Sequence, residues 1–291
     1  MILRDFLPAE TNRTWVQCYR IAALDFSGLT KIPSKTYPPK PENCLHFLLE
    51  GGFHILQANG QNSSYSQAVL VGQQTHTFER STTKRILNFQ IVFQSSGIYR
   101  LFGIPAHTLT NLHLDAEAAL GPDVRLLTQQ LLEAKNYQHM IQIADAFVIK
   151  LAKKASDHCK VIDKVVDFMK YETTYKLGKV AQQASLSTKQ FKRNFFRATG
   201  INPTLYSRIS RFNKVFNVKN RFPEVDWLTI ALTCGYFDYQ HLVRDYKEFT
   251  GLSPVLFHKL ECDSPECVLG LSNDLYKSRS GDYASLNLLQ H

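Results

Sequence analysis

Between Thr173 and Pro223 the chain has no aspartate or glutamate, although acidic residues occur throughout the rest of its 291 residues. The whole chain holds 34 Lys and Arg and 25 Asp and Glu, a net charge of +9. Residues 158–260 contain 17 basic and 8 acidic residues, so this stretch alone accounts for the excess, and the charges of the remainder cancel. A one-sided basic stretch favours a polyanion as partner; the alternative is a solvated basic face.

Long apolar runs are also lacking. None approaches the roughly 18–20 residues that a membrane helix needs, and the start, "MILRDFLPAETNR", lacks the apolar core of a signal peptide. We therefore expect a cytoplasmic protein with no membrane partner.

Patterns typical of enzymes and metal sites are absent as well. The six cysteines form no CxxC pair, which argues against a zinc site and a disulfide framework. The sequence has no GxSxG motif, P-loop or Rossmann fingerprint. His46, His54 and His76 do not form a compact cluster with a carboxylate. The sequence thus predicts no catalytic residue, no metal and no cofactor.

The first 110 residues have the short, alternating apolar pattern of β-strands. In "RILNFQIVFQ" the apolar residues from Leu87 to Phe93 alternate with Asn88 and Gln90, which predicts a half-buried strand. In "CLHFLLEGGFHILQA" the Gly-Gly pair at 51–52 predicts a hairpin turn. Several such strands indicate a sandwich or barrel. The aromatic residues of this half either line a ligand cavity or, for most of them, fill the core.

From about residue 122 the apolar period becomes helical. The polar segment "KKASDHCK", at 153–160, sets the predicted domain boundary. Before it, one helix has an apolar face that we expect to mediate self-association, unless it packs on its own β domain. This face consists of Met140, Ile143, Phe147 and Leu151.

Two stretches of the basic half repeat each other with an offset of 51 residues. "FKRNFFRATGINPTLY", at 191–206, aligns with "LVRDYKEFTGLSPVLF", at 242–257. In each copy we expect Gly200 or Gly251 to end a helix in the left-handed conformation. The proline that follows suits the first turn of the next helix. A supersecondary unit used twice explains the repeat.

A short helix, a tight turn and a second helix with a basic outer face make a helix-turn-helix, whose second helix enters the DNA major groove. Ser187 and Asp238 are the expected N-caps of the two second helices. Phe191 and Phe195 face inward in the first copy, so the opposite face is available to DNA. Arg and Lys can bind guanine, and Gln can bind adenine. The predicted DNA-binding residues are Lys189, Lys192, Arg193, Arg197, Tyr239, Gln240, Val243, Arg244 and Lys247. The alternative is a pair of helical hairpins in a scaffolding domain.

The two second helices differ in charge. The first has no acidic neighbour, whereas Asp238, Asp245 and Glu248 offset the basic residues of the second. Because phosphate contacts supply much of the affinity for DNA, we expect the first copy to dominate binding.

The second copy, "IALTCGYFDYQHLVRDYKEFTGLSPVLF", resembles the AraC/XylS family of bacterial transcription regulators. It has that family's succession of Ala, Gly-aromatic, Asp, an apolar residue, Arg, an aromatic residue and Gly-x-Ser-Pro. The resemblance covers about residues 160–260 and implies two helix-turn-helix subdomains joined by a long helix, "TLYSRISRFNKVFNVKN". Two departures are His258-Lys259, in place of the usual arginine, and Phe196, where a lysine is common. The second departure predicts that part of this surface is packed.

The first half is similar to the cupin-like β domain of some of these regulators, through "YPPKPENCLHFLL" and "GIYRLFGIPAHTLTN". The predicted fold class is therefore α+β. It combines an N-terminal cupin-like β-sandwich or barrel with flanking helices and a C-terminal all-α domain of two helix-turn-helix subdomains. The predicted domains are a sensor or dimerisation domain at 1–155, the DNA-binding domain at 156–261 and a flexible tail at 262–291.

The resemblance implies a sequence-specific DNA-binding transcription regulator, an activator, whose N-terminal domain senses a small molecule or dimerises. The implied partners are double-stranded DNA, a small-molecule effector, a second copy in a homodimer and RNA polymerase. The alternatives are a cupin-like enzyme that carries a DNA-binding half and a protein-interaction adaptor that reuses the helical module. The weak histidine pattern argues against the enzyme, and the carboxylate-free basic stretch argues against the adaptor.

Overall fold

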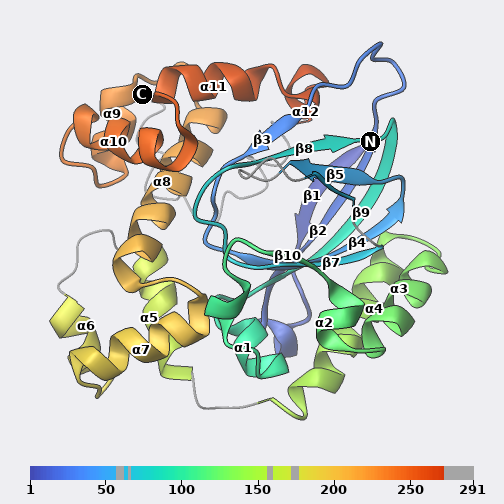
Figure 1. The fold of residues 1–291 in the computed structure, drawn as a ribbon, viewed down its shortest axis with the longest axis horizontal. Coiled ribbons are helices and arrows are strands. Elements are labelled where there is room, and N and C mark those ends of the chain that lie inside the picture. The colour runs from blue at the N-terminus through green and yellow to red at the C-terminus, as the bar shows by residue number, and fades with distance from the viewer. Residues whose placement is uncertain (57–61, 65–66, 156–159, 172–176, 272–291) are drawn as a thin grey trace.

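The computed structural model describes residues 1–271 apart from 57–61, 65–66, 156–159 and 172–176. It has the predicted α+β class, with antiparallel sheets in the first part of the chain and helices in the second (Figure 1).

Two antiparallel sheets form the N-terminal part. The larger sheet has the strand order β1 (Ile2–Phe6), β2 (Val16–Asp25), β9 (Arg85–Phe93), β4 (Asn43–Glu50), β7 (Ala68–Val71), β10 (His113–Asp115). The smaller sheet has the order β3 (Lys35–Tyr37), β8 (Phe78–Thr82), β5 (Phe53–Leu56), β6 (Asn62–Ser64). Buried side chains from both sheets, such as Val92 of the larger and Ile55 of the smaller, pack in one cluster. The sheets therefore face each other as a sandwich.

Helices cover the outer face of the larger sheet. η1 (Glu10–Asn12), α1 (Gly97–Phe102), η2 (Ala106–Leu109), α2 (Ala116–Leu120), α3 (Asp123–Leu132) and α4 (Tyr137–Ala152) belong to this part of the chain. In α4, Met140 and Phe147 are buried in one core with Phe89 of the sheet, and Ile143 and Leu151 pack against that core. The apolar face predicted to mediate self-association is thus internal, because the sheet of the same chain covers it.

Two predictions about strands are corrected. Strand β9 is buried on both faces, because it lies between β2 and β4 and the sheet is covered on one side by helices and on the other by the second sheet. Gly51, with φ of 72°, does not turn a hairpin, since β4 and β5 belong to different sheets. It carries the chain from one layer of the sandwich to the other.

The second part of the chain is helical and has a core of its own. Its elements are α5 (Lys160–Tyr171), α6 (Leu177–Gln183), α7 (Thr188–Thr199), α8 (Pro203–Arg221), α9 (Trp227–Thr233), α10 (Tyr239–Thr250), α11 (Pro254–Cys262) and α12 (Pro265–Val268). Two helix pairs joined by the long helix α8 agree with the sequence pattern. The predicted domain boundary between residues 155 and 156 adjoins 156–159, which lie outside the described residues.

The segment after Glu261, predicted to be a flexible tail, differs from that expectation as far as Leu271. It completes α11, forms α12, and places Leu269 and Leu271 against the buried side chains of Leu24 and Phe26. Residues 272–291 lie outside the described residues. In the described part of the chain, no helix is long and apolar enough to cross a membrane.

Candidate nucleic-acid interface

The first helix-turn-helix consists of α6 and α7. Ser187 caps α7 and forms a capping box with Gln190, and Gly200 ends the helix with φ of 92°. Phe191 and Phe195 are fully buried. These features fix which face of α7 points outward. Four predicted DNA-binding side chains are exposed on it: Lys189, Lys192, Arg193 and Arg197.

The second helix-turn-helix consists of α9 and α10. The Asp238 side chain accepts a hydrogen bond from the backbone N–H of His241 at 2.6 Å, and Gly251 ends α10 with φ of 73°. Leu242 and Tyr246 are buried. Gln240, Arg244 and Lys247 are exposed, whereas Tyr239 and Val243 are half-buried. All nine predicted contact residues thus reach the surface at least in part, although Tyr239 also packs against the helical core.

Helix α8 holds the two units together. Asn202 caps its N-terminus by accepting from the backbone N–H of Leu205, and Pro203 follows in its first turn. Near its start Tyr206 packs edge-on against Phe195 of α7, with ring centroids 5.5 Å apart. Further along, Phe212 packs against Tyr246 of α10 at 4.7 Å. One rigid helix therefore contacts both candidate recognition helices.

Asp245 of α10 faces α8 and not DNA. Its carboxylate, 3% exposed, accepts hydrogen bonds from Arg208 at 2.8 Å, from Arg211 at 3.2 Å and from the Tyr236 hydroxyl at 3.0 Å. Arg208 also pairs with Glu248, and these two carboxylates, that of Glu248 first, raise the pKa of Arg208.

The expectation that acidic residues weaken the second unit is therefore not supported for Asp245 and Glu248, since both are neutralised from α8. The sequence contained a signal for the inward orientation of Asp245. Asp245 comes three residues after the buried Leu242 and four before the buried Phe249, which places it on the inner side of the helix.

The N-terminal part of the chain covers one end of α7. The ring of Phe196 stacks on His107 of η2 with centroids 4.8 Å apart, and the Arg197 guanidinium lies 5.4 Å from the Tyr99 ring centroid. Phe196 thus makes a packing contact, as predicted, although its side chain is 42% exposed. Arg197 keeps an exposed side chain but interacts with the N-terminal part.

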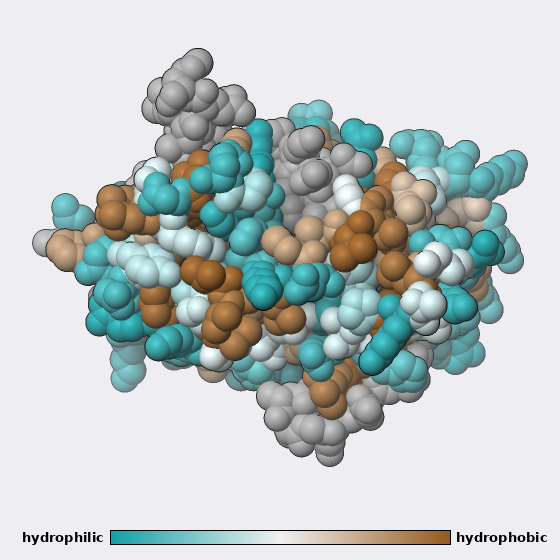
Figure 2. Space-filling model, turned by 90° about the horizontal axis from the view of Figure 1, so that it is seen from above, coloured by the Kyte–Doolittle hydropathy of each residue, from teal (hydrophilic) through white to brown (hydrophobic). Residues whose placement is uncertain are grey.

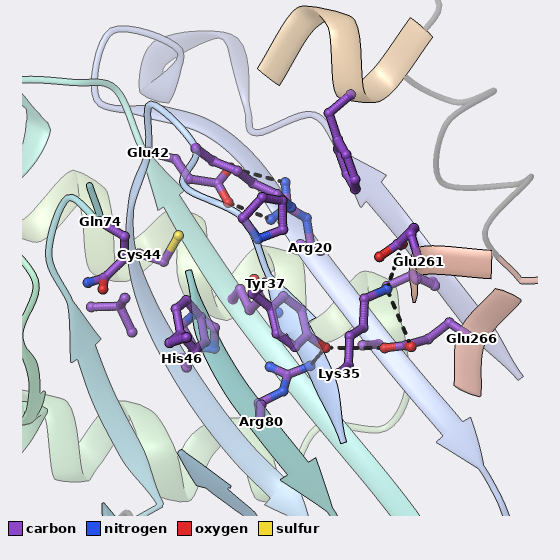
Figure 3. A pocket seen from close by; sticks show the side chains of 18 of the residues that line it. Arg20, Lys35, Tyr37, Glu42, Cys44, His46, Gln74, Arg80, Glu261 and Glu266 are labelled. Atoms are coloured by element: carbon purple, nitrogen blue, oxygen red, sulfur yellow. Dashed lines mark hydrogen bonds and ion pairs between the residues drawn. The ribbon is translucent and has the colours of Figure 1, made fainter. Parts of the chain in front are cut away.

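A cavity of about 110 Å³ lies inside the sandwich, beside residues of the helical part of the chain (Figure 3). Its walls come from β1, β2, β3, β4, β7, β8 and β9, and from Phe216, Glu261 and Glu266 of the helical part. Engineered cavities of similar size hold a molecule such as benzene. Of the aromatic residues of the first half, only Tyr37 and Phe78 line this cavity among the described residues; most of the others fill the core, as expected.

Ion pairs connect the cavity to the helical part. Figure 3 shows Lys35 between Glu261 and Glu266, at 3.0 and 3.4 Å, and the Tyr37 hydroxyl donates to Glu266 at 3.2 Å. Burial alone would raise the pKa of Glu266, but the cations of Lys35 and Arg80 outweigh burial and lower it. This end of the cavity is therefore charged at neutral pH.

The other cations of the cavity differ in their partners. Arg20 is buried and bound by Asp5 at 2.8 Å and Glu42 at 3.1 Å. Arg80 donates to the Tyr37 hydroxyl and lies 4.2 Å from its ring centroid. Arg80 forms no ion pair with any described residue. It is thus the guanidinium best placed to meet an anionic group in the cavity.

The buried histidines are neutral. Burial, with smaller effects of nearby cations, lowers the pKa of His46 well below its ordinary value and that of His113 to about 4. Within the described ranges, no group of three or more His, Cys, Asp or Glu side chains is arranged to hold a metal ion.

Comparison with known families finds two matches. Residues 180–259 match a helix-turn-helix domain family, and residues 4–115 match a domain of unknown function, DUF6597. No curated protein sequence matches the chain.

Solved structures with a similar arrangement include those of ToxT from Vibrio cholerae. One at 1.65 Å resolution is 12% identical, with a TM-score of 0.47, and the match covers 83% of this chain and 98% of that one. A second, of ToxT bound to (E)-4-(8-methylnaphthalen-1-yl)but-3-enoic acid, is 12% identical with a TM-score of 0.48, and the match covers 83% and 99% of the two chains.

Proposed function

We propose that this chain, whose C-terminal part is a helix-turn-helix domain of the AraC/XylS type, is a sequence-specific DNA-binding transcription regulator. One observation carries the proposal: two helix-turn-helix units, 51 residues apart in sequence, each present an exposed basic side chain at the same position, Arg193 and Arg244. Both helices are capped at each end, so these faces are held in place. Arg193 and Arg244 lie in the second turn of their helices, next to the N-terminal residues that reach base edges in the major groove.

The test is selection of bound duplexes from a random-sequence DNA pool by the full-length protein, followed by anisotropy titration. We expect two short sequence elements in the selected DNA, one for each recognition helix. Absence of any sequence preference at several salt concentrations would refute sequence-specific binding.

We further propose that the cavity binds a small organic molecule with an anionic group, and that the N-terminal part acts as a sensor and not as an enzyme. The cavity is lined by apolar side chains such as Leu24 and Val71, with Arg80 at its charged end. A ligand with an apolar body and a carboxylate or similar group would match both the apolar walls and Arg80. Thermal-shift screening of small organic anions tests this, with Arg80→Met as the comparison. A ligand that stabilises both proteins equally would show that Arg80 is not its partner.

The remaining parts of the proposal concern partners and location. Large apolar side chains are exposed on α9 and α11, namely Leu228, Leu232, Val255, Leu256 and Leu260, and the face seen in Figure 2 carries hydrophobic patches among hydrophilic side chains. Such patches are typical of protein contacts and support a protein partner, which we propose to be RNA polymerase for a regulator that acts as an activator. The bacterial cytoplasm is the location that we propose for such a regulator.

A homodimer also stays a proposal, and it needs a surface other than the buried face of α4. Leu126 and Leu132 of α3 and Ile149 of α4 are exposed and are the residues we propose for it. Sedimentation of the wild type and of Leu126→Glu tests this surface; a wild-type monomer at micromolar concentration would refute the dimer.

A further inference from the structure

We propose that the N-terminal part blocks the first recognition helix from DNA, and that DNA binding by this helix requires the block to open. We call the contact of Tyr99 and His107 with Phe196 and Arg197 the clamp. The inference rests on the proposed function and adds a way in which the chain regulates its own DNA binding.

The clamp lies on the predicted DNA-facing side of α7. At 100° per residue, Phe196 points within about 20° of Lys189 and lies between the directions of Lys192 and Arg193. Along the helix axis it is only about 4.5 Å from Arg193, at a rise of 1.5 Å per residue. His107 therefore stacks on a side chain of the face that would read DNA, towards the C-terminal end of α7, and leaves Phe196 42% exposed.

The first recognition helix cannot contact η2 and lie in the major groove at the same time. An α-helix with its side chains is about 10–12 Å across, and the major groove is about 12 Å wide. A helix seated in the groove leaves no room for η2 on its outer face. With the clamp closed, the first recognition helix cannot enter the groove along this face.

The clamp is held by contacts around it. The Thr110 hydroxyl donates to the carbonyl oxygen of Gly200 at 2.8 Å, at the end of α7. The hydroxyls of Ser95 and Tyr206 are hydrogen-bonded at 2.8 Å in a buried position. Arg100, whose side chain is 3% exposed, pairs with Asp163 of α5. These contacts join the N-terminal part to the C-cap of α7 and to the neighbouring helices α8 and α5.

No such block is found on the second recognition helix within the described residues. Lys247 matches Phe196 across the repeat, and among the described residues no side chain of the N-terminal part stacks on it as His107 stacks on Phe196. The contact of the N-terminal part with α10 is a hydrogen bond from the backbone N–H of Thr77 to the carbonyl oxygen of Phe249, a residue of the inner face. The second unit is thus free to bind DNA while the first is blocked.

The clamp shares a wall with the cavity. Gly72 and Gln74 line the cavity, and the segment that contains them is bonded to the segment after η2. The backbone N–H of Gly72 donates to Leu112 at 3.1 Å, and that of Asn111 donates to Gln73 at 2.9 Å. A Cβ atom on Gly72 would lie 1.9 Å from the carbonyl oxygen of Leu109. A ligand that displaces this wall would therefore move η2.

The test is anisotropy titration of full-length proteins on a duplex selected from a random pool by the wild type. An aromatic stack contributes about 0.5–1.5 kcal/mol. If the closed form predominates, loss of the stack raises the fraction of protein that can bind DNA by the factor that corresponds to this free energy. His107→Ala should therefore bind DNA about two- to tenfold more tightly. His54→Ala, which removes an exposed histidine elsewhere in the N-terminal part, should bind like the wild type.

Two further measurements separate the clamp from a general loss of structure. In a Phe196→Ala background, His107→Ala should give no further gain, because the stack is already broken. In hydrogen exchange, DNA should slow the amides of α7 and speed those of residues 106–112.

Unchanged or weaker binding by His107→Ala, or DNA protection of both α7 and η2, would overturn the clamp. If the wild type and all variants bound no DNA at any salt concentration, the proposed function itself would fail, and the clamp with it.

Discussion

Replacing Asp245 tests how the second recognition helix is fixed to α8. In Asp245→Ala, Arg208, Arg211 and the Tyr236 hydroxyl lose their shared acceptor. The carboxylate is 3% exposed and Arg211 is 13% exposed, so water replaces the lost bonds poorly. Removing one member of a buried ion pair costs about 3–5 kcal/mol. We expect the free energy of unfolding of the second unit to fall by that amount.

Glu248→Ala is a matched control, because the same Arg208 binds both carboxylates. Glu248 is 56% exposed, and an exposed pair contributes about 0–1 kcal/mol. The comparison therefore varies the burial of the acid while it keeps the basic partner.

Urea unfolding followed by Trp227 fluorescence measures the second unit, since the Trp227 ring lies 5.9 Å from that of Tyr246. Trp15 is replaced by Phe in all proteins, which leaves one tryptophan. Equal losses for Asp245→Ala and Glu248→Ala would refute the view that burial makes Asp245 the main anchor of α10.

Three other outcomes are expected. Arg193→Ala and Arg244→Ala should each weaken binding to selected DNA by about 1–3 kcal/mol and relax the preference at one base position, measured by titration on single-base variants of the duplex. Lys247→Ala should lower the slope of log affinity against log salt by about one with no change of base preference; an unchanged slope would exclude a phosphate contact. Because burial lowers the pKa of His113 to about 4, the folded state disfavours its charged form. The contribution of His113 to stability should therefore be fully present above about pH 6.5 and should fall by about 3 kcal/mol towards pH 4. His113→Gln should flatten this dependence in urea titrations and leave the part due to His46, and an unchanged curve would contradict the assignment.

The helical half could be predicted well because its signals are local. Ser187, Gly200, Asp238 and Gly251 act on the turn of backbone next to them, so each cap is readable within a few residues. In the β half the alternation identified strands but not their partners. Pairing joins residues far apart in sequence, and a Gly-Gly pair looks the same whether it turns a hairpin or crosses between sheets.

The apolar face of α4 shows the same limit at the level of packing. Periodicity indicated that Met140 and Phe147 are buried but not what covers them, since a sheet of the same chain and a second copy need the same apolar residues. The cavity could not be predicted either. Lys35 and Glu261 are 226 residues apart, and neither lies in a recognisable motif.

The internal repeat nevertheless contained a signal for the clamp. Two copies with one function should carry similar residues at matched outer positions, and Arg193 and Arg244 do so. Position 196 carries Phe where position 247 carries Lys, and a large apolar ring in the middle of a basic face has no role in contacting phosphate. Such a difference between copies indicates a side chain that only one copy packs against another part of the chain. The sequence could not show which residue packs on Phe196, because His107 is 89 residues away in the β half and only the fold brings the two rings together.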